Sequence, residues 1–177
     1  MKARSRQRGV TWIETCTVMA VIAVVTTQAA PSMATLIDSR RLEGTAVQLA
    51  TDVQYARTEA IARNQPVRIT LHNAAQGSCY VLHTGPSAQC TCNNLAPAAC
   101  SGDAREIKTV LLPTSQGVTL AASTASVAFD PLHGTSTPTA TLRVTGRQGR
   151  AIHQIINVMG RVRSCTPSAG VPGYPTC

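Results

Sequence analysis

The sequence predicts an α+β fold in which one long N-terminal helix, membrane-spanning in its first half, packs on an antiparallel β-sheet domain stabilised by disulfide bonds. An uncharged apolar segment near the N-terminus runs into apolar residues with helical spacing, which indicates one long helix. After Pro66 the apolar periodicity changes to two, which is typical of β-strands. All but one of the 7 cysteines follow the apolar segment, and an even number favours disulfide pairs.

The N-terminal segment is apolar enough to cross a membrane. No charged residue occurs from Thr15 to Ile37, and Cys16 is expected to be a small apolar residue of this helix. A helix of that length spans a hydrocarbon core of about 30 Å. The preceding basic residues favour a cytoplasmic N-terminus, and they are Lys2, Arg4, Arg6 and Arg8. The alternative is an ordinary secretory signal, for which "TTQAAPSMA" offers a cleavage site.

A short motif, "RGVTWIE", lies at the start of the apolar segment. Its last residue is an acid, Glu14. A carboxylate in a membrane segment is costly and usually functional, although it also favours the positive end of its own helix. The motif resembles the processing site of type IV prepilins and type II secretion pseudopilins. It departs from the usual pattern, which has Phe at the position of Val10 and Leu at that of Trp12. The resemblance implies cleavage between Gly9 and Val10 by the prepilin peptidase, with methylation of the new N-terminus.

This resemblance also implies a type IV pilin-like fold and a place in a filament. Residues 1–9 would be the leader peptide, residues 10–37 the transmembrane N-terminal helix, and residues 38–177 a periplasmic pilin-like domain. The protein would cross the bacterial inner membrane once before it joins a pilus or pseudopilus, where its partners are other pilins or pseudopilins. Glu14 would attract the free N-terminal amine of a neighbouring subunit.

The helix is expected to continue beyond the membrane and to end before Pro66. Its apolar residues step by three and four and so form one stripe: Leu42, Ala46, Leu49, Val53, Ala56 and Ala60. We expect this stripe to pack on a sheet rather than to bind a partner. The polar residues off the stripe are Arg41, Gln48, Asp52 and Glu59.

Seven segments with strand character follow the helix. They are residues 67–72, 79–84, 107–112, 117–121, 126–130, 140–145 and 151–158. Glycines at residues 145–150 indicate a turn between the last two. Residues 85–104 are expected to form a loop, and residues 166–177 an irregular tail.

The cysteines allow two interpretations. Cys165 and Cys177 flank the tail, and we expect them to pair. The other four would form two disulfide bonds, although zinc ligation remains an alternative with an unfavourably tight C-x-C spacing; they are Cys79, Cys90, Cys92 and Cys100. The histidines are isolated, solvated strand residues in this interpretation, and no catalytic motif is present, so we expect no enzymatic activity, metal or cofactor.

The C-terminal segment is basic. No acid occurs in residues 139–177, which contain Arg143, Arg147, Arg150, Arg161 and Arg163. Arg161 and Arg163 are two residues apart, so on an extended chain they project to the same side, and Gly160 allows a turn before them. Two guanidinium groups on one edge suit a clamp for phosphates, and we expect Arg143, Arg147 and Arg150 to add to the positive field.

Two motifs in this region, "FDPLHGT" and "IINVMGRVRSC", resemble the ectodomain of the GspH/FimT family of minor pilins. In the FimT branch the G-R-x-R element is associated with DNA binding during natural transformation. The resemblance implies that Gly160, Arg161 and Arg163 bind DNA, with Cys165 as their tether. Aromatic residues are scarce, which favours double-stranded DNA held without sequence preference over stacked single strands.

Two alternatives to DNA binding remain for these arginines. The arginines form a contact with another pilin or a plain solvated surface. The protein is then a structural pseudopilin at the tip of a type II secretion filament, or a minor pilin that primes pilus assembly.

Overall fold

The computed structural model describes residues 9–93, 98–168 and 170–177. Most of the expected leader, residues 1–8, lies outside the described residues. The chain divides into two compact units, Met1–Ile37 and Asp38–Cys177. Because every residue of the buried core belongs to the second unit, that unit is the folded domain.

The first helix, α1 (Trp12–Arg63), contributes to both units. Its most apolar stretch of 18 residues has a mean hydropathy of 1.6, so the helix is long and apolar enough to cross a membrane. Large apolar side chains that the structure describes in the first unit are exposed, among them Trp12, Ile13, Leu36 and Ile37. Exposure of so many apolar groups is unfavourable in water and suits lipid or other helices.

In the second unit, α1 buries the predicted apolar stripe. All six stripe residues are at most 2% exposed. Asp52, which the pattern places off the stripe, is also buried. Its carboxylate is stabilised there by hydrogen bonds from the Tyr80 hydroxyl at 2.8 Å and the Lys108 ammonium at 2.6 Å. The helix ends in a left-handed residue, Asn64, and the Gln65 amide donates to the carbonyl oxygen of Ala60.

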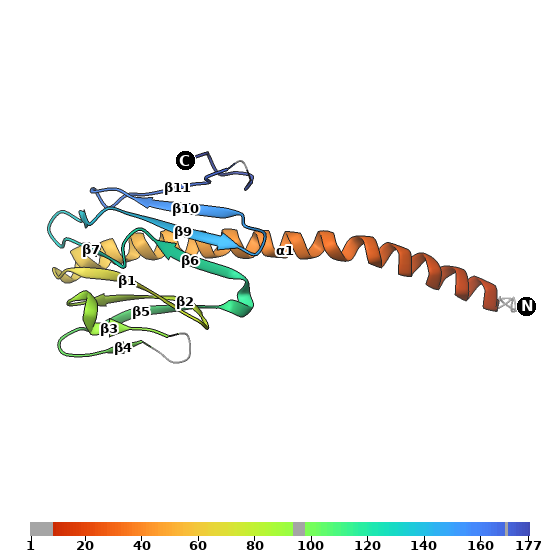
Figure 1. The fold of residues 1–177 in the computed structure, drawn as a ribbon, viewed down its shortest axis with the longest axis horizontal. Helices are drawn as coiled ribbons and strands as arrows, with labels where there is room; N and C mark the ends of the chain where they lie inside the picture. The colour runs from red at the N-terminus through yellow and green to blue at the C-terminus, as the bar shows by residue number, and fades with distance from the viewer. Residues whose placement is uncertain (1–8, 94–97, 169) are drawn as a thin grey trace, which may run out of the picture. The chain divides into compact units, whose positions relative to one another are not determined.

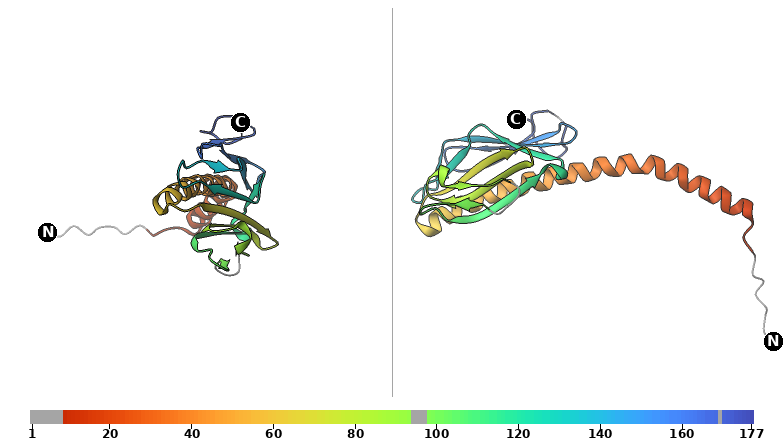
Figure 2. Two further views of the ribbon diagram at one scale, coloured as in Figure 1. Left: turned by 90° about the vertical axis from the view of Figure 1, so that its left-hand side faces the viewer. Right: turned by 60° about the horizontal axis from the view of Figure 1, so that its bottom comes forward.

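Two antiparallel sheets pack on the same side of α1 (Figures 1 and 2). The first has the order β5-β2-β1-β7-β8 and the second has the order β11-β10-β9-β6. The strands of the first sheet are β1 (Val67–Ala74), β2 (Gly77–Thr84), β5 (Glu106–Pro113), β7 (Ser126–Phe129) and β8 (Ser136–Thr137). Those of the second are β6 (Val118–Ala122), β9 (Ala140–Gly146), β10 (Ala151–Ile156) and β11 (Val162–Cys165). The long helix on antiparallel strands confirms the predicted fold class.

Strand β2 is buried along its whole length, which the simple alternation of polar and apolar residues does not predict. Tyr80 and Leu82 face the main core with the helix. Cys79 and Val81 face a second cluster formed with the short pair β3 (Cys90–Thr91) and β4 (Ala99–Cys100). The described residues of the predicted loop therefore cover the outer face of β2.

The described residues form three disulfide bonds. Cys79 pairs with Cys92, Cys90 with Cys100, and Cys165 with Cys177. The last pair is the one expected from the sequence, and the first two leave no thiolate among these four for zinc. The free cysteine, Cys16, is exposed on α1.

Candidate functional site

Residues 9–14 of the N-terminal motif are exposed. Gly9 and Val10 precede α1, and Glu14 lies in its first turn, where its amide donates to the carbonyl oxygen of Thr11 at 3.0 Å. The Glu14 carboxylate forms no salt bridge with any residue that the structure describes.

A tight hairpin connects β10 to β11 and carries the C-terminal motif. The Gly160 amide donates to the carbonyl oxygen of Asn157 at 2.9 Å, and Gly160 has a φ of +69°. The Asn157 amide in turn donates to the carbonyl oxygen of Arg161 at 3.1 Å. This turn ends β10 at Ile156, two residues before the end of the strand predicted from the sequence.

The two motifs that carry the GspH/FimT resemblance contact each other. A Cβ atom at Gly160 would lie 2.4 Å from the carbonyl oxygen of Gly134, so only glycine allows this approach. The Ser136 hydroxyl donates to the carbonyl oxygen of Asn157 at 2.6 Å, and the Arg57 guanidinium donates to that of Gly134 at 2.9 Å. Gly160 therefore has a structural role: it fixes the hairpin against the rest of the domain.

The segment before Gly134 is held by Asp130. Its carboxylate accepts hydrogen bonds from the amides of Leu132 at 3.0 Å and His133 at 2.7 Å. These bonds, with that from the His133 amide as the largest cause, lower the pKa of Asp130.

Two arginines lie on the outer face of the β11-β10-β9-β6 sheet, and a third, Arg161, directly precedes β11. In the register of the sheet Arg163 lies opposite Ile155, and Arg143 lies opposite His153. Their neighbours Leu142, Val144 and Val162 face the core, so both arginines face outward. Alternation along an extended chain would give the side chain of Arg161 the same direction as that of Arg163.

We call Arg143, Arg161 and Arg163 the arginine face. All three are exposed, and none forms a salt bridge with a residue in 9–93, 98–168 or 170–177. Two strand spacings and an offset of two residues separate Arg143 from Arg163, so their Cα atoms lie about 12 Å apart. Burial of the ring, followed by the charge of Arg143, lowers the pKa of His153 between them. The face is therefore positive without depending on that histidine.

The C-terminal tail fixes the edge of this sheet. The Cys165–Cys177 disulfide closes the tail, and the Thr166 amide donates to the carbonyl oxygen of Pro175 at 2.8 Å. The Thr166 hydroxyl donates to the carbonyl oxygen of Ala151 at 3.1 Å, and Val171 is buried in the core. β11, which carries Arg163, is thus held on both sides.

The other two C-terminal arginines lie elsewhere. Arg147 and Arg150 flank the turn between β9 and β10, at the end of β10 opposite Arg161. The Arg147 guanidinium donates to the carbonyl oxygen of Ser115 at 2.7 Å, and that of Arg150 donates to the Gln148 side chain at 2.8 Å. The sequence predicts a single positive field for all five arginines, whereas the structure separates them into two groups.

His83 is buried rather than solvated. Its Nε2 lies 2.8 Å from the Thr70 hydroxyl, and its Nδ1 lies 2.9 Å from the carbonyl oxygen of Thr84. Burial lowers the pKa of His83. These contacts place the ring inside the β1–β2 pairing, so its role is structural.

Comparison with known proteins agrees with this architecture. The family of type II transport protein GspH matches residues 45–160 of the chain. The crystal structure of the type IV minor pilin FimU from Pseudomonas aeruginosa (strain PAO1) superposes with a TM-score of 0.52 and 18% sequence identity, over 75% of this chain and 93% of that chain. The curated proteins contain no sequence match. At this identity the likeness to FimU shows the fold alone.

Proposed function

Because the chain belongs to the GspH family of type II transport proteins and has the fold of a type IV minor pilin, we propose that it is a filament subunit whose arginine face binds double-stranded DNA. As a member of this family it is a minor pilin or pseudopilin that associates with other pilins. DNA uptake during natural transformation is the process that this binding would serve.

The observation that carries the DNA proposal is the arginine face itself. It presents exposed guanidinium groups on a rigid sheet, and each suits bidentate contact with a phosphate. Contacts with phosphates position a protein on DNA without reading its sequence. Binding is therefore expected on unrelated duplexes.

In this proposal the subunit is first inserted in the inner membrane and then assembled into a filament. The prepilin peptidase cuts after Gly9, residues 10–37 anchor the chain, and residues 38–177 fold in the periplasm. The exposed carboxylate of Glu14 then pairs with the N-terminal amine of a neighbouring subunit in the filament. Such pairing satisfies a charge that is costly in an apolar surrounding.

Salt-dependent DNA binding tests the proposal. We expect a fragment of residues 38–177, which contains the whole core, to bind unrelated duplexes with similar affinity. On duplex DNA, log K falls with log salt by about 0.9 for each phosphate contact. Arg161→Gln and Arg163→Gln should each lower the slope by about 0.9, and the double variant by about 2. Lysine at both positions should restore only part of the affinity, because the bidentate fork is lost.

Arg105→Gln is the matched control, because it removes one exposed positive charge outside the arginine face. It should leave the salt slope unchanged. Equal effects of all three single variants would contradict a defined site. If the parent fragment itself does not bind DNA, the second candidate becomes the better one: a structural pseudopilin of a type II secretion filament, which the description of the matching family favours.

A further inference from the structure

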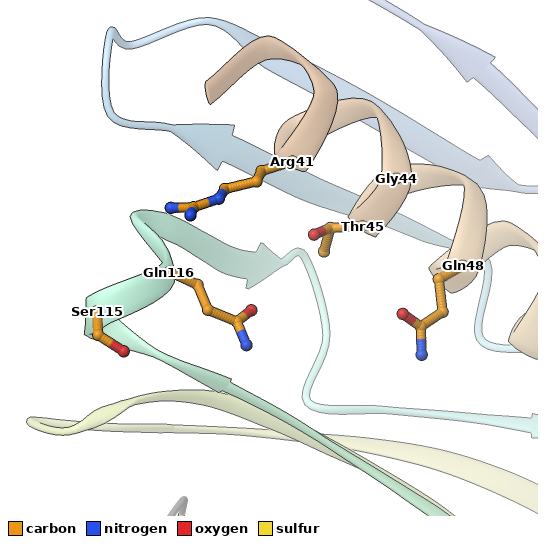
Figure 3. Close-up of a pocket in the computed structure, with 6 residues that line it drawn as sticks. All are labelled: Arg41, Gly44, Thr45, Gln48, Ser115 and Gln116. Atoms are coloured by element: carbon orange, nitrogen blue, oxygen red, sulfur yellow. The ribbon is translucent and has the colours of Figure 1, made fainter. Parts of the chain in front are cut away.

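A polar pocket lies between α1 and the segment that joins β5 to β6. Its volume is about 530 Å³. The helix contributes Arg41, Gly44, Thr45 and Gln48, and the short 3-10 helix η2 (Thr114–Gln116) contributes Ser115 and Gln116. Arg41 extends from the helix toward η2, while Gln48 and Gln116 project into the space between them (Figure 3). None of the residues that line this pocket is among the functional residues predicted from the sequence.

The chemistry of the pocket suits an anion. None of the six lining residues is acidic, and their side chains offer hydroxyl, amide and guanidinium donors. Arg147 adds a second positive charge beside the pocket, because its guanidinium donates to the carbonyl oxygen of the lining residue Ser115 at 2.7 Å. One guanidinium group among hydroxyl and amide donors, with a second positive charge nearby, suits a phosphate.

The position of the pocket in the chain indicates which phosphate it meets. Arg41 follows Ile37, where the uncharged segment ends, by four residues of α1, which is a rise of about 6 Å along the helix. The headgroup layer of a bilayer begins where the hydrocarbon core ends and is about 5–8 Å thick. A subunit anchored by residues 10–37 therefore keeps the pocket within reach of lipid headgroups.

We infer that this pocket binds the phosphate of an anionic phospholipid headgroup and so holds the unassembled subunit against the membrane surface. The inference rests on the membrane insertion proposed above and does not depend on DNA binding.

Gly44 provides a way to block the pocket without removing charge. A Cβ atom added there would meet no atom within 4 Å, and the residue lies inside a regular helix. A larger side chain at this position is therefore compatible with the fold and would occupy the pocket. Arg41→Gln and Arg147→Gln remove its positive charges instead.

The test uses the full chain in micelles of a neutral detergent. Native mass spectrometry would count bound dihexanoyl phosphatidylglycerol, with dihexanoyl phosphatidylcholine as the neutral comparison. The parent should bind the anionic lipid in preference. Arg41→Gln and Arg147→Gln should each weaken binding about tenfold, the effect of one lost charge-assisted hydrogen bond. Gly44→Leu should weaken binding at least as much, because its side chain fills the pocket. Arg105→Gln, which removes a charge outside the pocket, should bind as the parent does.

Several outcomes would overturn the inference. Equal binding of both lipids, an equal loss in Arg105→Gln, or full binding by Gly44→Leu would show that the pocket is not the site. Displacement of the lipid by an equal concentration of inorganic phosphate would indicate a site for small anions instead. Extraction of the full chain from cell membranes by alkaline carbonate tests the anchoring separately, so a failure of anchoring is distinguishable from a failure of the pocket.

Discussion

Gly160 and Gly149 have nearly the same backbone conformation in different surroundings. Their φ angles are +69° and +73°, but a Cβ atom would lie 2.4 Å from a backbone oxygen at Gly160 and meet nothing within 4 Å at Gly149. Gly149→Ala should therefore lower the free energy of unfolding by about 1 kcal/mol, because alanine is strained in the left-handed conformation but meets no other atom. Gly160→Ala should cost about 2–4 kcal/mol, because the hairpin must also move. Urea denaturation measures both, and equal losses would contradict the close packing of the two motifs.

Burial of His83 makes the domain sensitive to mild acid. Burial lowers its pKa from the ordinary value of 6.5, so the unfolded chain binds a proton at a higher pH than the folded one. The stability from the neutral ring is complete above about pH 6.5 and is lost as the pH falls from there toward the folded pKa. His83→Gln should flatten the pH dependence of the unfolding free energy between about pH 7 and 5. An unchanged slope would mean that another group, such as His153, dominates.

At the scale of single residues, the sequence predicts side-chain directions that depend only on the spacing of neighbouring residues. For example, alternation along an extended chain predicts that Arg161 and Arg163 face the same side. The separation of Arg147 and Arg150 from them could not be predicted, because it depends on the lengths of β9 and β10 and on their register. Asp52 was missed for a similar reason: its partners Tyr80 and Lys108 come from strands distant in the sequence.

At the scale of elements, the disulfide that closes the tail stabilises β11. Cys165 and Cys177 are separated by 12 residues in sequence. Replacing both with Ser should lower the unfolding free energy by about 3 kcal/mol in the chain-entropy model. Hydrogen exchange should also become faster at the amides of Thr166 and Cys177, which bond within the tail. Slow exchange in the double variant would show that the buried Val171 holds the tail without the disulfide.

The elements themselves are largely predictable, and their ends are less so. The helix stripe and the seven strand segments follow from periodicity and correspond to α1, β1, β2, β5, β6, β7, β9 and β10. The short strands β3, β4 and β8 have two residues each, too few to show a period. Burial of both faces of β2 depends on the disulfide-linked loop that folds over it, and local sequence carries no sign of that contact.

At the scale of the whole molecule, the chain combines a folded domain with an apolar segment that is not buried in it. The core residues all follow Asp38, while α1 before that point exposes its apolar side chains. Folding and assembly should therefore be separable by mutation. Glu14 is the residue on which to test this, because its carboxylate has no salt-bridge partner among the residues that the structure describes.

We expect Glu14→Ala to leave the unfolding free energy of the domain unchanged and to exclude the protein from filaments. The substitution removes the carboxylate that would pair with a neighbouring amine, and it touches no core residue. Sheared filaments and membrane fractions, probed for the mature protein, measure incorporation and membrane insertion together. Mass spectrometry of the membrane fraction should find an N-terminus at Val10 in both parent and variant.

Glu14→Gln is the matched variant, because it keeps the shape and hydrogen-bonding capacity of the side chain while removing its charge. If pairing of charges drives assembly, the Gln variant should fail as the Ala variant does. Filaments that contain the Gln variant at the parental level would contradict the pairing of charges and favour a hydrogen-bonding role. A mature N-terminus near Ser32 would mean that the apolar segment is removed as a secretory signal, and Glu14 would then be absent from the mature protein.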